Sequence, residues 1–163
     1  MRAGLAEHLG SRQVGRVVYG SIIGLALVVA VERHPPAPGV VAVWLLGTAV
    51  AVGLAEVYSD VVGAETRARR RVTRPEVVHM TEDAGAVGFG VVFPAVFFLL
   101  AAIGMLATGT AFTLAKWSGV GLIGSYGYWG VRLAGGTPAQ ALVRGALVAV
   151  VGAGLVVLKA LVH

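Results

Sequence analysis

Two acidic residues, Glu56 and Asp60, lie inside an apolar run, residues 40–62, that is long enough to cross a membrane as a helix. An ionisable side chain at membrane depth costs about 2.5–3.5 kcal/mol on insertion scales, so it usually faces a protein interior, a partner or an ion path. Because the two residues are one helical turn apart, their carboxylates lie on one face of the helix. There they can bind a cation or form an ion pair with a basic residue of another helix.

The composition is that of an integral membrane protein. Hydrophobic residues make up 57% of the 163 residues and charged residues only 13%, with a mean hydropathy of +0.84. Ordinary soluble domains contain about 45–50% apolar and about 25% charged residues. The basic excess lies at the ends of apolar segments, so we expect a lipid bilayer as partner and no nucleic acid. The absence of cysteine excludes disulfides and thiolate metal sites.

The elements that position the two acids are expected to be membrane helices, in an all-α fold with a single membrane domain, residues 1–163. Five apolar stretches approach or exceed the roughly 20 residues that a helix needs to cross the hydrocarbon core. They cover residues 14–31, 40–62, 84–106, 110–131 and 139–161. No small-residue cleavage site follows the first stretch, which indicates a retained helix. The prolines at positions 35, 36 and 38 favour a tight hairpin between the first two spans.

The basic residues predict the orientation of these spans. With five spans, the N-terminal segment and the loops after the second and fourth spans share one side, which carries most of the arginines. The opposite side carries Arg33, Lys116 and Lys159. The positive-inside rule therefore predicts a cytoplasmic N-terminus and a C-terminus outside.

Residues 64–83 form the expected cytoplasmic loop. Its first half is predicted to extend the second span as a helix, and its second half to form a short helix that begins at Pro75. Its basic residues favour a topology anchor and lipid contact, or a docking site for a membrane protein partner. These residues are Arg67, Arg69, Arg70, Arg71 and Arg74.

Glycines recur at helical spacing in the first and fourth predicted spans. Small residues at such positions let helix backbones approach closely, which favours a tight bundle and a homodimer. The glycines concerned are Gly20, Gly24, Gly121, Gly124 and Gly127.

Three short motifs follow one another along the chain. They are residues 18–24 (VYGSIIG), 46–60 (LGTAVAVGLAEVYSD) and 89–94 (FGVVFP). With the basic exit after Gly63, these motifs make the chain resemble a divergent, bacterial-type member of the vacuolar iron transporter family, whose members have five membrane helices and a cytoplasmic N-terminus. The resemblance implies transport of iron or manganese across the cell inner membrane. It assigns Glu56 to an acidic position of the family and so to a metal ligand, with Asp60 beside it.

Two positions depart from the family's pattern. Ile23 replaces an aspartate of the first helix, and Asp60 replaces a methionine of the second. The family's cytoplasmic metal-binding domain is reduced here to the loop, whose carboxylate and imidazole groups suit ferrous iron or manganese. The weaker candidates for metal ligands there are Glu76, His79, Glu82 and Asp83. No cofactor is expected beyond such a divalent metal ion.

Depth in the membrane gives Glu56 an alternative partner. Glu56 lies about seven residues, or roughly 10 Å, from the cytoplasmic end of its span, and Arg144 lies at nearly the same level. If Glu56 and Asp60 bind metal, the protein is a divalent-cation transporter with proton exchange at Glu56. If a Glu56–Arg144 ion pair forms, the protein is a non-transporting structural or interaction component of the membrane. An enzyme is not expected, because the spans contain no nucleophile with a matched histidine and acid.

Overall fold

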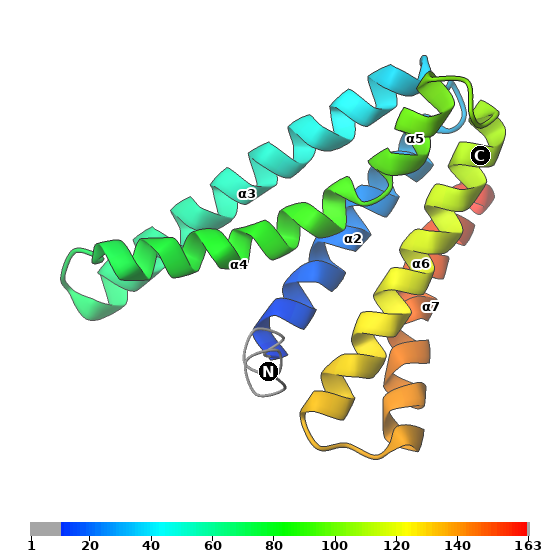
Figure 1. Ribbon diagram of the computed structural model, residues 1–163. Helices are drawn as coiled ribbons and strands as arrows, with labels where there is room; N and C mark the ends of the chain where they lie inside the picture. Colours follow the sequence, from blue (N-terminus) through cyan, green and yellow to red (C-terminus); the bar gives the residue numbers. More distant parts are fainter. Residues whose placement is uncertain (1–10, 163) are drawn as a thin grey trace.

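The computed structural model describes residues 11–162, and every regular element in this part of the chain is an α-helix (Figure 1). The predicted all-α fold is therefore confirmed for the described residues. The helices are α2 (Ser11–Val31), α3 (Pro38–Ala68), α4 (Arg74–Val92), α5 (Ala95–Ala102), α6 (Thr108–Leu133) and α7 (Pro138–Val162).

Helix α2 is the central element of the molecule. Figure 1 shows α3 and α4 as a long antiparallel hairpin on one side of α2, and α6 and α7 as an antiparallel pair on the other. Helix α2 contacts both pairs, mainly through α4 and α6. The α3–α4 turn and the α6–α7 turn lie at the same end of the molecule as the start of α2 (Figure 1).

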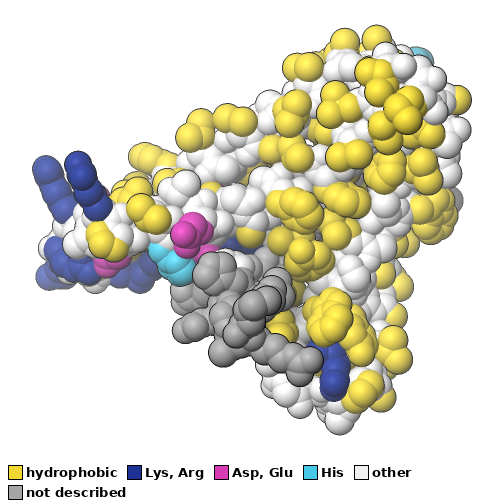
Figure 2. Space-filling model, viewed as in Figure 1, with side chains coloured by type: hydrophobic (Ala, Val, Ile, Leu, Met, Phe, Trp, Pro, Cys, Tyr) yellow, Lys and Arg dark blue, Asp and Glu magenta, His cyan; other side chains and the backbone are white. Residues whose placement is uncertain are grey.

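Several helices are long and apolar enough to cross a membrane. By length and composition, α2 from Gln13 and α3 qualify, and α4 with α5 adds a third candidate if this bent pair is one span. Figure 2 shows hydrophobic side chains spread over the helices, whereas many Lys and Arg side chains gather at the tip of the α3–α4 hairpin. These features indicate a membrane protein, while the count of five spans and the orientation remain predictions.

Helix α3 is longer than the predicted second span because it continues into the basic loop. It begins at Pro38, where the missing N–H of proline costs no helical hydrogen bond. It ends at Ala68, and Arg69 follows in the left-handed region with φ 52°. The predicted helical extension of the second span is thus present, and it ends before the last arginines of the loop.

The predicted third span, residues 84–106, consists of two helices. Helix α4 already begins at Arg74, so the short helix expected at Pro75 is continuous with this span. Helix α4 ends at Val92, and α5 continues after Pro94 at an angle of 49°. Proline lacks a backbone N–H and its ring clashes with the carbonyl four residues earlier, which explains the bend.

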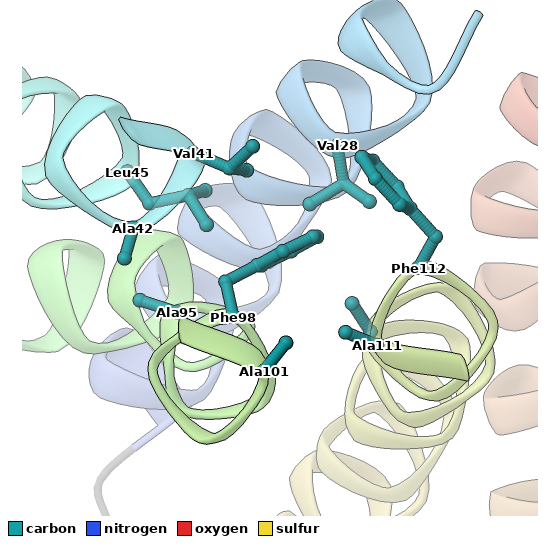
Figure 3. Close-up of a cluster of buried hydrophobic side chains, with 10 residues drawn as sticks. Val28, Val41, Ala42, Leu45, Ala95, Phe98, Ala101, Ala111 and Phe112 are labelled. Carbon is teal, nitrogen blue, oxygen red and sulfur yellow. The ribbon is translucent and has the colours of Figure 1, made fainter. Parts of the chain in front are cut away.

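The largest hydrophobic core lies at the end of the molecule opposite to the α3–α4 turn. There, side chains of α2, α3, α5 and α6 meet around Phe98, which is fully buried (Figure 3). Phe98 and Phe112 pack edge to face with ring centroids 4.8 Å apart. Because α5 contributes Phe98, the bend at Pro94 turns the end of the α3–α4 hairpin toward the bundle.

Glycines bring α2 and α4 into direct backbone contact. A Cβ atom at Gly20 would overlap the carbonyl oxygen of Val87, and one at Gly24 would lie 2.8 Å from that of Val91. Gly124 and Gly127 similarly face α7, whereas the space beside Gly121 is open. Four of the five predicted packing glycines therefore lie at helix contacts within the described chain.

Candidate functional site

A single arginine, Arg16 of α2, holds three carboxylates from two other helices. Its Nη1 donates a hydrogen bond to Oε1 of Glu56 at 2.9 Å, and its Nη2 donates one to Oδ2 of Asp60 at 2.9 Å. Oδ2 of Asp83, on α4, lies 3.3 Å from the same Nη2. We call these four residues the Arg16 cluster.

The register of α2 against α4 explains why the cluster forms. Gly20 packs on Val87, and moving one helical turn back along both helices leads to Arg16 and Asp83. The glycine contact thus brings the guanidinium to the level of the aspartate. On α3, Glu56 and Asp60 are one turn apart and share the face that meets Arg16.

The cluster is partly shielded from solvent. The side chain of Asp83 is 7% exposed, and those of Glu56 and Asp60 are 28% and 32% exposed. In such surroundings a charged hydrogen bond is stronger than at an open surface, and an unpaired charge is more costly. Asp83 is therefore the most constrained of the three carboxylates.

The charges of the Arg16 cluster do not balance. Arg16 is the ion-pair partner of all three carboxylates within residues 11–162. When the three acids are ionised, one guanidinium therefore leaves two negative charges unneutralised. The cluster is an acidic site with one resident cationic side chain, and its excess negative charge favours the binding of a cation.

The carboxylates do not form a ready metal-binding set. Among the described residues, no group of three or more His, Cys, Asp or Glu side chains is arranged to hold a metal ion. The guanidinium of Arg16 occupies the place where the three carboxylates converge. A metal ion bound by Glu56 and Asp60 would therefore require Arg16 to move aside.

The weaker candidates for metal ligands are dispersed along α4. Glu76 accepts hydrogen bonds from Arg70 and from Thr73, whereas Asp83 faces Arg16. His79 and Glu82 are exposed on α4, with Nδ1 of the histidine 3.6 Å from the carboxylate. The structure thus does not bring these four acids and bases together at one point.

Arg144 does not meet Glu56. Glu56 is paired with Arg16, while Arg144 lines a groove between α2, α6 and α7. This corrects the predicted Glu56–Arg144 pair. Depth along the membrane does not give the side of the bundle that each residue faces. The missed signal was the glycine face of α2, which continues from Gly20 to Arg16 and points at α4.

The basic tip of the α3–α4 hairpin is exposed. Arg70 donates two hydrogen bonds to Glu76, at 2.7 and 3.0 Å, and also donates one to the carbonyl of Arg71. The bond from Arg70 and the bonds from the backbone and hydroxyl of Thr73 lower the pKa of Glu76 to about 2. The other arginines of the tip are exposed. They are Arg67, Arg69, Arg71 and Arg74.

No family model, curated protein or solved structure matches the chain. The resemblance to vacuolar iron transporters therefore rests on the three motifs and on the order of the apolar segments.

Proposed function

We propose that this protein is a five-span inner-membrane protein that moves a divalent cation, iron or manganese, through the Arg16 cluster. The observation that carries the proposal is the charge excess of the cluster, in which three carboxylates face one guanidinium. A purely structural ion pair needs one acid for one base. Two further acids at the edge of an apolar span are stabilised by binding protons or a cation.

The length of α3 supports access to this site from the cytoplasm. Helix α3 has 31 residues, or roughly 46 Å, whereas the hydrocarbon core is about 30 Å thick. If α3 enters the membrane near Pro38, about 20 residues bring it to the level of Glu56 and Asp60 at the opposite face. The arginines beyond Asp60 then lie in the cytoplasm, as the positive-inside rule requires.

Arg16 has a defined part in the proposed transport. While it contacts Glu56 and Asp60, it fills the position that an incoming cation would take. A divalent ion would displace the guanidinium and bind the hard carboxylate oxygens, which suit manganese. When the metal ion leaves, the guanidinium of Arg16 would return to the carboxylates. The metal ion and the guanidinium would thus occupy the same acidic site in turn.

The decisive experiment is a flux assay with purified protein in sealed vesicles. Fe²⁺ or Mn²⁺ entry is followed with a trapped metal-sensitive dye, and proton movement with a trapped pH dye. We expect metal flux that Glu56→Gln and Asp60→Asn abolish. Glu65→Gln is the matched control, because Glu65 is a carboxylate of the same helix α3 that lies outside the cluster. Absence of iron, manganese and proton flux in vesicles that pass a working positive control would refute the proposal.

A second candidate function is a non-transporting structural or interaction component of the membrane. The observation in its favour is that Arg16 already joins α2, α3 and α4 through its three contacts. This function predicts that Glu56→Gln lowers the stability of the bundle while the wild-type protein carries no flux. It also predicts that a membrane partner co-purifies and that Arg67→Gln or Arg74→Gln at the hairpin tip releases it.

The proposed homodimer is testable in the same preparation. Cross-linking in native membranes and the mass of the detergent-solubilised particle report the number of copies. If the protein is a monomer and still transports metal, the homodimer is wrong, whereas transport through the Arg16 cluster is supported.

A further inference from the structure

A groove of about 640 Å³ opens between α2, α6 and α7, on the side of α2 opposite to the α3–α4 hairpin. Its α2 wall includes Val14, Gly15 and Val18, and α7 contributes Arg144 and Val148. Sites for small ligands commonly have volumes of about 300–1,000 Å³. The groove therefore has room for a ligand well beyond the size of a single ion.

Among the described residues that line this groove, Arg144 is the one that carries a charge. Within the described residues its guanidinium forms no ion pair and no side-chain hydrogen bond, because the acids across α2 are held by Arg16. Arg144 is the seventh residue of α7, which begins at Pro138, so it lies roughly 9 Å along the helix from the α6–α7 turn. A cation at this depth between apolar helices is stabilised by an anionic partner.

The lining of the groove combines this charge with an apolar wall. Val18, Val131 and Val148 provide hydrocarbon surface, while Gly127 and Gly130 of α6 add no side chain to the lining. A free phosphate would leave the valine surface uncovered. A phospholipid would place its phosphate at Arg144 and an acyl chain along the valines, and basic pockets between membrane helices on the cytoplasmic side bind such headgroups.

We propose that this groove is a binding site for an anionic phospholipid, with Arg144 as the residue that binds its phosphate. The site is separate from the Arg16 cluster, since α2 lies between them. Phosphatidylglycerol is the probe of choice, because it carries a net negative charge that phosphatidylcholine with the same acyl chains lacks.

Native mass spectrometry of the full-length protein in detergent tests this assignment. The wild-type protein should retain phosphatidylglycerol in preference to phosphatidylcholine. Arg144→Gln should reduce this preference about tenfold, the size expected when one charge-assisted hydrogen bond is lost. Arg33→Gln, which removes an exposed arginine between α2 and α3 at the other end of α2, should leave it unchanged. An unaltered preference in Arg144→Gln would overturn the proposal.

A second variant adds a large side chain to the wall of the groove without changing its charge. A Cβ atom at Gly15 would meet nothing within 4 Å, so the side chain of Gly15→Leu extends into open space beside the groove. It should weaken binding of both lipids, whereas Gly121→Leu, at an equally open glycine outside the groove, should not.

Thermal unfolding gives an independent readout of the same variants. Added phosphatidylglycerol should raise the unfolding temperature of the wild-type protein and of Gly121→Leu, but not that of Arg144→Gln or Gly15→Leu. If inorganic phosphate alone stabilises the wild-type protein as much as phosphatidylglycerol does, the site is one for free anions and the lipid assignment is wrong. Equal stabilisation of Gly15→Leu and wild type by the lipid would also contradict it.

Discussion

The two faces of α2 differ in both charge and packing. Toward α3 and α4, Arg16 is surrounded by three carboxylates and the neighbouring glycines lie in backbone contact. Toward α6 and α7, Gly15 faces open space and Arg144 has no ion partner among the described residues. Gly15 and Arg16 are consecutive, so about 100° of helix rotation separates the two environments.

Helix α2 thus keeps the carboxylates of the Arg16 cluster apart from Arg144. One face has an excess of negative charge, and the other has an arginine with no ion partner in the part of the chain that the structure describes, although both lie near the same end of the bundle. A bundle held together by ion pairs alone would have brought them into contact. Their separation leaves an acidic site available to a cation and a basic groove available to an anion.

The largest expected effect comes from removing the central charge of the acidic face. Arg16→Gln leaves three carboxylates without a cation, and loss of one partner of a buried ion pair costs about 3–5 kcal/mol. Because Arg16 is partly exposed, we expect a loss near the lower end, about 3 kcal/mol in the free energy of unfolding. Chemical unfolding in detergent, followed by tryptophan fluorescence, measures it.

Arg144→Gln is the matched control for this measurement. It removes the same type of side chain from the other face, where no intramolecular ion pair is broken, so the change should stay within about 0.5 kcal/mol in lipid-free detergent. Equal losses in both variants would show that the two faces do not differ in the way that their ion pairs indicate.

Much of the fold follows from the sequence because hydrophobic length and breaker residues act locally. The apolar runs around Arg16 and Glu56, the proline turn before Pro38 and the helical exit toward Arg67 are all such local features. The bend at Pro94 is local too, but an apolar run that continues on both sides of a proline does not show whether the helix only kinks or divides into two.

The partner of Glu56 could not be read from the sequence for a different reason. Glu56 and Asp60 were found because charges are rare in an apolar span. Choosing between Arg16 and Arg144 requires the rotation of each helix about its axis and the order of helices around α2. Both depend on contacts between residues far apart in the chain, such as Gly20 with Val87.

A smaller effect is expected from the packing difference between the two faces. A Cβ atom at Gly90 would overlap backbone atoms of α2, so Gly90→Ala should cost about 2 kcal/mol, within the range for overpacking a tight contact. Gly15→Ala should be neutral or stabilising by up to about 1 kcal/mol, because alanine favours a helix over glycine. Chemical unfolding of the two variants under the same conditions measures the difference in their free energies of unfolding. A larger loss for Gly15→Ala than for Gly90→Ala would contradict the tight packing of α2 on α4 and the open space beside Gly15.

Removing one acid should be far milder than removing the arginine. Asp83→Asn reduces the excess negative charge and keeps the other two contacts of Arg16, so we expect a change of at most about 1 kcal/mol, in either direction. A double-mutant cycle with Arg16→Gln separates the pair from its surroundings. A loss as large as that of Arg16→Gln would mean that every carboxylate is needed for stability, which would argue against a charge excess reserved for a cation.

The smallest effect concerns a balanced pair outside both faces, Arg70 with Glu76. The pKa of Glu76 is lowered to about 2 by Arg70 and Thr73, so its stabilising contribution is complete above the ordinary glutamate pKa and is lost as pH falls from there toward 2. The protection of the hairpin-tip amides, measured relative to their intrinsic exchange rates at each pH, should therefore fall with acidification in the wild-type protein. In Glu76→Gln it should be lower already at neutral pH and change little with acid. If acid changes the protection of the tip equally in both proteins, the Arg70–Glu76 pair does not stabilise the α3–α4 turn. In that case, of these two sets of ion pairs, only those of the Arg16 cluster would affect stability.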